Sequence, residues 1–302
     1  MHDWNKSVKG VVIGSAVGIA FGLGGFLFAE IPQTHAMGPV MFLLVPFAAG
    51  FAIATVTKGA QRISAAALLA TLGSLVVLIA TGAETPLCAV LAFPLLFLGL
   101  MVGVALAYLL RDVAKFGGGA NATKSIVFLS VPLLVFAGHR IELSTLIHPR
   151  PETVTSSTWF QAEPDQIWID LQSFDSLTAQ KPLLMYIGLP IPVRCTMQGS
   201  GQGAKRTCYF DHGYIEETVT EWQPASRMRL SIDRTNMPGR HWLGFEEAEY
   251  VLRQDNGGTI LTRSTTIISN LSPAFYWRPF ERWGVASEHE YIFRDLARRL
   301  NH

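Results

Sequence analysis

Long stretches without a single charged side chain occupy the first 110 residues, and this feature constrains the fold more than any other. They lie at residues 10–29, 39–57, 63–83 and 85–110. A helix needs about 20 apolar residues to cross a hydrocarbon layer about 30 Å thick. Each stretch reaches or approaches this length. The sequence therefore predicts an integral membrane protein that begins with an α-helical bundle.

The composition agrees with a membrane protein that also carries a polar part. Of 302 residues, 49% are hydrophobic and 16% are charged, whereas ordinary proteins carry about 25% charged residues. The net charge of +1 provides no basic surface, so we expect membrane lipids and no nucleic acid as partners.

A cleavable signal peptide is the rival interpretation of the N-terminus. The run at 10–29 is longer than the roughly 7–15 apolar residues of such peptides, which favours a retained helix.

The positive charges of the connections predict the orientation of the bundle. Lysine and arginine occur at 1–9, 58–62 and 111–124, and are absent from 30–38 and 82–86. Cytoplasmic connections carry an excess of these residues. The N-terminus and the connection at 111–124 are therefore expected in the cytoplasm, with a bacterial inner membrane as the setting.

The segment after residue 124 decides on which side of the membrane the rest of the chain lies. Residues 125–138 form an uncharged run that contains Pro132, and extended to Ile147 the segment has 23 residues. In that form it would cross as a fifth span. As an interfacial or re-entrant helix it would leave four spans and a cytoplasmic domain. We favour five spans and an extracytoplasmic domain.

The first uncharged run has small residues at helical spacing, and these are Gly14, Gly18, Gly22 and Gly25. Such a face lets membrane helices approach closely. We expect it to serve helix packing or self-association into a homo-oligomer. The four long runs hold no charged residue, which argues against an ion or proton pathway.

Residues 148–152 (HPRPE) indicate the boundary between a membrane domain at 1–147 and a soluble domain at 148–302, because prolines in a polar segment end a helix. After it we predict a strand at 153–161, a helix that begins at Pro164, and a second helix at roughly 176–188. Short strands joined by tight turns follow, and the chain closes with a helix from about Pro273 to Asn301. The six strands are expected at 192–198, 205–211, 213–223, 226–232, 242–253 and 259–268. The fold class is a bundle of four to five spans plus an α+β domain, in which a curved antiparallel sheet surrounds the long helix.

Two of the three cysteines flank a glycine-rich turn of this meander. If the hairpin loop centres on Ser200–Gln202, Cys195 and Cys208 lie opposite one another, at a spacing that a disulfide accepts. A disulfide persists in oxidising compartments, so the pair would support an extracytoplasmic domain. The alternative is a pair of unrelated strand cysteines that face the core. Cys88 lies in an apolar run and is expected to be inert.

The order TSSTWFQAEPDQIWIDLQSFDSL, meander, long C-terminal helix resembles the START/Bet v 1-like superfamily, also called SRPBCC or polyketide cyclase/dehydrase-like. Glu163-Pro164 and Trp168 stand where that family has a strand ending in an Ala-Pro-like step and a helix with a buried tryptophan. The resemblance covers about residues 150–300 and implies a helix-grip fold around a deep apolar cavity. Members of the family bind lipids, sterols, polyketides or other hydrophobic molecules, and some catalyse cyclisation or dehydration.

In a helix-grip fold, the apolar stripe of the C-terminal helix faces the sheet and the cavity. His289 lies within this stripe, between Val285 and Ile292, whereas Glu288 and Glu290 are expected in solvent. Arg206 and Arg263 are candidates for cavity or cross-strand partners. The candidate cavity residues are Trp168, Tyr209, Phe245, Trp283 and His289.

Candidate catalytic residues are His289 and an inward carboxylate, either Glu247 or Glu249. Strict alternation places both glutamates on one strand face with Phe245, and a carboxylate there could act as a base. The simpler alternatives are a histidine that is satisfied by a neighbour and a solvated outer strand face.

Two apolar segments suit a membrane surface. The segment 275–283 (FYWRPFERW) combines aromatic rings with arginines, as at membrane–water interfaces. The segment 181–193 is too apolar for an exposed loop, and would be a lid, a membrane-dipping segment or an inward-packed helix. For the aromatic segment, the alternative is a helix start that packs on the sheet.

The sequence contains no phosphate-binding loop, no cysteine or histidine spacing suited to zinc or haem, and no nucleophile elbow. We therefore expect no metal and no cofactor. Our hypothesis is a membrane-anchored binding protein for a lipid or other hydrophobic small molecule. The alternatives are a cyclase/dehydratase-like enzyme and a non-catalytic assembly protein. In the assembly protein, side chains such as Trp168, Phe245 and Trp283 would fill the cavity.

Overall fold

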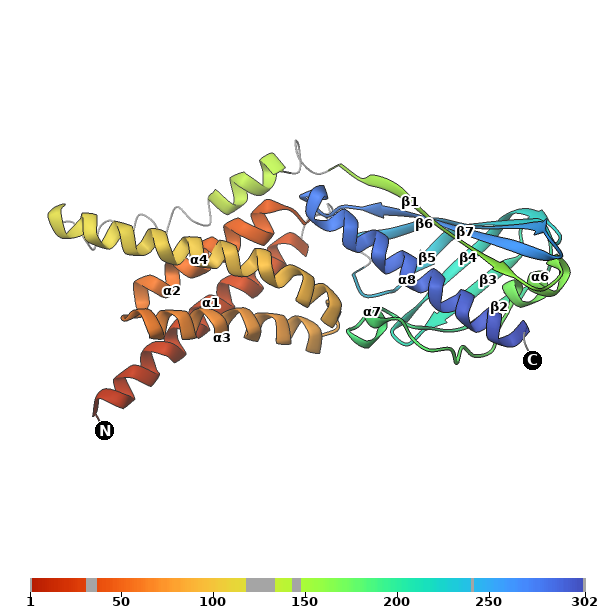
Figure 1. The fold of residues 1–302 in the computed structure, drawn as a ribbon. Helices are drawn as coiled ribbons and strands as arrows, with labels where there is room; N and C mark the ends of the chain where they lie inside the picture. Colours follow the sequence, from red (N-terminus) through yellow and green to blue (C-terminus); the bar gives the residue numbers. More distant parts are fainter. Residues whose placement is uncertain (1, 31–36, 118–133, 143–147, 240–241, 301–302) are drawn as a thin grey trace. The chain divides into compact units, whose positions relative to one another are not determined.

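A computed structural model describes residues 2–30, 37–117, 134–142, 148–239 and 242–300 (Figure 1). The chain divides into two compact units, with the main boundary between His148 and Pro149. We describe each unit by itself.

The N-terminal unit is helical. It consists of α1 (His2–Glu30), the short π-helix η1 (Val40–Leu44), α2 (Val45–Val56), α3 (Ala60–Ala80) and α4 (Pro86–Gly117). Three segments are long and apolar enough to cross a membrane, namely Val8–Leu27, Ala60–Ala80 and Pro86–Leu110, whereas the apolar helix Val40–Val56 is shorter. Residues 134–142 are also helical. The rest of the predicted fifth segment lies outside the described residues, so the number of spans stays a prediction.

The glycine face of α1 packs against other helices of the same unit. A Cβ atom placed on Gly14 would meet Thr57 and Ala66, and one on Gly18 would meet Ile53 and Ala70. Only glycine allows such a close approach between helices. This face is therefore occupied within the chain, and it gives no support to the predicted self-association.

The C-terminal unit contains seven strands and three helices among its described residues. In chain order the elements are β1 (Arg150–Phe160), α6 (Pro164–Gln172), α7 (Leu183–Tyr186), β2 (Pro192–Gln198), β3 (Lys205–Phe210), β4 (Gly213–Gln223), β5 (Arg227–Thr235), β6 (Leu243–Asp255), β7 (Gly258–Ser269) and α8 (Ala274–Leu300). The seven strands form one antiparallel sheet with the order β1-β7-β6-β5-β4-β3-β2. Figure 1 shows α8 along one face of this sheet, an arrangement compatible with a helix-grip fold.

Local signals explain why α6 begins where it does. Pro164 occupies the first turn, where its missing N–H costs nothing. Glu163 and Gln166 form a reciprocal capping box, in which Gln166 accepts a hydrogen bond from the backbone N–H of Glu163. Ile167, Trp168 and Leu171 then face the core.

The second predicted helix, at roughly 176–188, is wrong over most of its length, because α7 has only four residues. Asp295 of α8 accepts hydrogen bonds from the backbone N–H groups of Thr178 and Ala179, at 2.7 and 3.1 Å. Pro182 then precedes the first residue of α7. The segment before Pro182 is thus held by a side chain of α8 and not by helical hydrogen bonds.

The main core lies between α8, α6 and the sheet. Its largest members include Trp168, Tyr250, Phe160 and Phe293. Trp168 packs edge-on against Trp222, with 4.9 Å between the ring centroids. A second cluster joins Val154, Ile267 and Val285. These two clusters hold α8 on the sheet and thereby position the residues of the candidate site.

Candidate functional site

One face of the sheet lies under α8, and we call it the inner face. On β1 the even-numbered residues point to it, with Val154 and Phe160 buried, and on β7 the odd-numbered residues do, including Arg263 and Thr265. The period of two along each strand assigns every other side chain to this face. Position along the strand therefore decides which polar groups are buried under α8.

A groove of about 380 Å³ lies between β1 and α8. In the part of the chain that the structure describes, β1 is an edge strand that pairs with β7 alone, so no described strand covers this side of the sheet. Glu290 and Arg294 of α8 line the groove and form an ion pair, with 2.5 Å between a guanidinium nitrogen and a carboxylate oxygen. The lining consists of Ser156, Ser157, Thr158, Trp159 and Phe160 of β1, and of Ala286, Glu290, Phe293, Arg294 and Ala297 of α8.

His289 is fully buried between α8 and the sheet, and both ring nitrogens have hydroxyl partners. Nε2 lies 2.8 Å from Oγ1 of Thr265, and Nδ1 lies 3.0 Å from Oγ of Ser156. Burial, together with the positive charge of Arg263, lowers the pKa of His289 to about 2. The imidazole is therefore neutral at physiological pH. It matches the simpler alternative to a catalytic role, a histidine whose hydrogen bonds are made by neighbouring side chains.

The other predicted cavity residues do not gather around His289. Trp168 and Phe245 are packed into the two core clusters. Tyr209 is on the opposite, outer face, where the guanidinium of Arg194 lies 4.4 Å from its ring centroid. Trp283 is 47% exposed. The prediction that Tyr209 and Trp283 line the cavity is therefore wrong.

The prediction of an inward-facing Glu247 or Glu249 is also wrong, because both side chains lie on the outer face. A β-bulge between Phe245 and Glu247 shifts the alternation of β6, so that Phe245 packs toward α8 while both glutamates point away from it. Although burial opposes it, hydrogen bonds from Arg229 and Arg227 lower the pKa of Glu249. An ionised carboxylate on the far side of the sheet cannot act together with His289.

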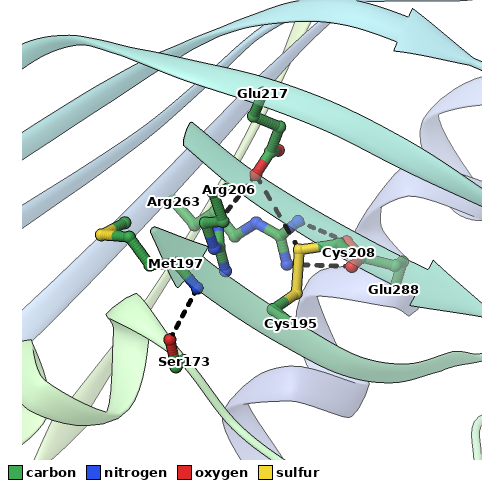
Figure 2. Close-up of a disulfide and its surroundings, with 8 residues drawn as sticks. All are labelled: Ser173, Cys195, Met197, Arg206, Cys208, Glu217, Arg263 and Glu288. Atoms are coloured by element: carbon green, nitrogen blue, oxygen red, sulfur yellow. Dashed lines mark hydrogen bonds and ion pairs between the residues drawn. A yellow bond between two sulfur atoms is a disulfide. The ribbon is translucent and has the colours of Figure 1, made fainter. Parts of the chain in front are cut away.

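A cluster of charged side chains is buried on the inner face near the disulfide (Figure 2). Arg206 of β3 donates to Glu217 of β4 at 3.1 Å, and both side chains are at most 7% exposed. Arg263 of β7 pairs with Glu288 of α8 at 2.9 Å. Glu288 is therefore mostly buried and not in solvent as predicted. The sequence marked Arg206 and Arg263 as candidates for cavity or cross-strand partners, but it could not identify the partners, which are Glu217 on a neighbouring strand and Glu288 on α8.

Cys195 and Cys208 form a disulfide, and their Cα atoms are 4.1 Å apart. They pair directly across β2 and β3, in the register that the glycine-rich hairpin predicts. Figure 2 shows the bridge beside Glu217, whose Oε2 lies 3.8 Å from Sγ of Cys208. The bridge thus joins the edge strand β2 to the strand that carries Arg206.

The start of α8 combines exposed and buried aromatic rings. Trp277 is buried, whereas Phe275 is 82% exposed. Arg278 and Arg282, which flank these rings, both bind the buried carboxylate of Glu152 on β1. The two arginines thus share one carboxylate of the sheet, and their side chains stay about half exposed. Among the described residues, no cluster of histidine, cysteine, aspartate and glutamate suits a metal ion.

No protein-family model matches the chain, and no curated protein matches it. Solved structures match about half of it. A START superfamily protein from Mycobacterium smegmatis is 10% identical with a TM-score of 0.37, and the match covers 49% of this chain and 97% of that one. The Aha1 protein from Colwellia psychrerythraea is 17% identical with a TM-score of 0.31, over 48% and 98% of the two chains. Protein CV1439 from Chromobacterium violaceum is 12% identical with a TM-score of 0.34, over 50% and 97%.

Proposed function

We propose that the chain is a membrane-anchored protein whose C-terminal unit binds a lipid or other hydrophobic small molecule between the sheet and α8. The groove between β1 and α8 is the observation that carries this proposal. Its volume of about 380 Å³ is within the range of small-molecule sites, roughly 300–1,000 Å³. Phe160, Phe293, Ala286 and Ala297 supply apolar lining, while Glu290 and Arg294 offer a polar rim. Burial of apolar surface contributes about 25 cal/mol per Å² to such binding.

The proposed site differs from the deep cavity that the family resemblance implies. Trp168, Phe160, Phe293 and Tyr250 fill the centre of the unit with packed side chains. The ligand therefore enters at the edge of the sheet, beside β1, and lies along the surface of α8.

The proposed location is the extracytoplasmic side of a membrane. Three helical segments are long and apolar enough to serve as spans. The disulfide between Cys195 and Cys208 supports an oxidising compartment for the C-terminal unit. A binding site tethered next to a bilayer would exchange lipid-like ligands without a long path through water.

The enzymatic alternative has little support from the candidate residues. An effective acid or base has a pKa near the working pH, whereas that of His289 is lowered to about 2. Glu247 and Glu249 lie on the outer face. No carboxylate of the predicted pair is therefore available to His289.

Mass spectrometry of organic extracts tests the proposal. The full-length protein is purified in detergent and compared with two variants, each with one added tryptophan. Ala286→Trp fills the groove lining, whereas Ile169→Trp changes a side chain on α6 that is 69% exposed and outside the groove. Circular dichroism checks that both variants are folded.

We expect a stoichiometric hydrophobic molecule in the wild type and in Ile169→Trp, and its loss from Ala286→Trp. Equal retention in all three proteins would place the ligand elsewhere. The absence of a bound molecule from the wild type in several detergents would count against the binding function and favour a role in protein assembly.

A further inference from the structure

The inner-facing hydroxyls of β1 differ from the outer-facing ones in their hydrogen bonds. On the outer face, Ser157 pairs with Thr262 at 2.8 Å, and Thr155 pairs with Ser264 at 2.9 Å. These hydroxyls satisfy one another across β1 and β7. Ser156 and Thr158 point to the inner face and line the groove. They are two residues apart, which separates them by about 7 Å along the strand.

Ser156 has one partner among the described residues, the Nδ1 atom of His289 at 3.0 Å. A serine hydroxyl offers one donor and two acceptor positions. A neutral imidazole has one N–H and one acceptor nitrogen, so Nδ1 either donates to Ser156 or accepts from it. In both cases the oxygen of Ser156 keeps hydrogen-bonding capacity for a further group.

His289 fixes the position of that hydroxyl. Its other nitrogen lies 2.8 Å from Oγ1 of Thr265, and the ring is fully buried. The imidazole is thus held at both nitrogens, between β1 and β7. Ser156 is only partly buried and lies in the same groove as Phe293 and Ala286. A ligand in the groove would meet this oriented hydroxyl beside the apolar side chains of Phe293 and Ala286, with Thr158 also in the lining.

We infer that the groove selects hydrophobic ligands that carry a hydroxyl or carbonyl oxygen, which hydrogen-bonds to Ser156, with His289 as the positioning residue. This inference rests on the proposed binding function. A purely hydrocarbon ligand would cover Ser156 and leave its remaining capacity without a partner, which is costly once the ligand excludes water. An oxygenated ligand supplies a partner for this remaining capacity.

Two probes that differ by one polar group test the inference. The full-length protein in lipid nanodiscs is loaded with the fluorescent reporter 1-anilinonaphthalene, which is displaced by 4-hexylphenol or by 4-hexyltoluene. Empty nanodiscs provide the background. Partition of each probe into lipid is the same for every variant, so the ratio of the two apparent affinities isolates the hydrogen bond.

Ser156→Ala removes the hydroxyl, and Ser264→Ala is the matched control, since its hydroxyl bonds to Thr155 on the outer face and does not line the groove. We expect the preference for the phenol to fall about five-fold in Ser156→Ala, the value of one ordinary hydrogen bond, and to stay unchanged in Ser264→Ala. If Ser156→Ala does not fold, Ser156→Cys replaces it, because a thiol is a weak donor and acceptor.

The outcomes separate the inference from the proposed function. If both probes displace the reporter and the preference is the same in the wild type and in Ser156→Ala, the groove binds ligands but Ser156 does not select them. If the reporter does not bind the wild type above the empty nanodiscs, the binding function itself fails, and the inference fails with it.

Discussion

At the scale of single residues, burial controls the charge of His289. The pKa of this side chain is lowered to about 2 from an ordinary value of 6.5, chiefly by loss of contact with water. Such a group binds fewer protons in the folded than in the unfolded state. Stability is therefore full above pH 6.5 and falls as the pH drops toward 2, by about 1.4 kcal/mol per unit.

The replacement His289→Gln should reduce this acid sensitivity. Glutamine keeps a donor and an acceptor but does not titrate, so the free energy of unfolding should depend less steeply on pH between 6 and 4. Chemical denaturation at a series of pH values measures the slope. His212→Gln, at a side chain that is 75% exposed, is the control and should keep the wild-type slope. Equal slopes for all three proteins would contradict the burial of a neutral imidazole.

The buried pair of Arg206 and Glu217 gives a second prediction. Replacement of one partner by an apolar residue leaves the other charge unpaired in the core, which costs about 3–5 kcal/mol of unfolding free energy. The double variant Arg206→Met/Glu217→Leu should therefore be more stable than Glu217→Leu alone. Burial by itself raises the pKa of Glu217, in opposition to Arg206 and Arg263.

Lys205 and Asp233 provide the control for this comparison. They form an ion pair next to Arg206 on the outer face, with side chains 63% and 38% exposed. Loss of an exposed pair costs about 0–1 kcal/mol. Urea denaturation of the wild type, Glu217→Leu, the double variant and Lys205→Met decides the matter. If Glu217→Leu is no more destabilised than Lys205→Met, the inner-face pair is not a buried one.

At the scale of elements, the disulfide stabilises the edge of the sheet. β2 pairs with β3 and, through an isolated bridge at Cys195, with Phe174. Cys195 and Cys208 join β2 and β3 over a sequence separation of 13 residues. Closing a loop of this size stabilises a fold by about 3 kcal/mol in the chain-entropy model. We expect Cys195→Ser/Cys208→Ser to unfold at a lower denaturant concentration than the wild type.

Alkylation of the denatured protein checks the bridge directly. Without reductant, iodoacetamide should modify one cysteine, Cys88, and after reduction it should modify all three. Intact mass spectrometry counts the added groups. Cys88→Ser, which leaves the disulfide in place, is the control for stability. Three modified cysteines without reductant would show that the thiols are free.

The strands and the register of the cysteine hairpin could be predicted from local sequence. Glycine and proline turns separate runs with period two, and the loop around Gly201 places Cys195 opposite Cys208. The bulges could not be predicted, because nothing local marks them. The bulge after Phe245 alone moves Glu247 and Glu249 to the outer face. Likewise, α7 is short because Asp295, more than 100 residues away, binds the preceding backbone.

The candidate site was only partly predictable for the same reason. The helical stripe identified His289 as an inner residue. Its partners Ser156 and Thr265 lie on strands that are adjacent in the sheet but 109 residues apart in sequence. The groove depends on β1 being an edge strand, which follows from the strand order and not from any motif.

At the scale of the whole molecule, the side of the membrane on which the C-terminal unit lies is a prediction that joins both parts of the chain. The positive charges of the connections predict that the N-terminus and the segment 111–124 lie in the cytoplasm. If residues 125–147 cross the membrane, the C-terminal unit is extracytoplasmic, where its disulfide would persist. If they do not cross, the disulfide would face a reducing compartment.

Reporter fusions in a bacterial host distinguish these topologies. Alkaline phosphatase is active only outside the cytoplasm, because it needs its own disulfides, whereas a green fluorescent protein exported in the unfolded state does not fluoresce. A fusion after Lys124 should give fluorescence without phosphatase activity. A fusion after His302 should give the reverse, since the predicted fifth span would lie between the two points. Fluorescence from both fusions would mean four spans and a cytoplasmic C-terminal unit, and the thiols of Cys195 and Cys208 should then be found reduced in cells.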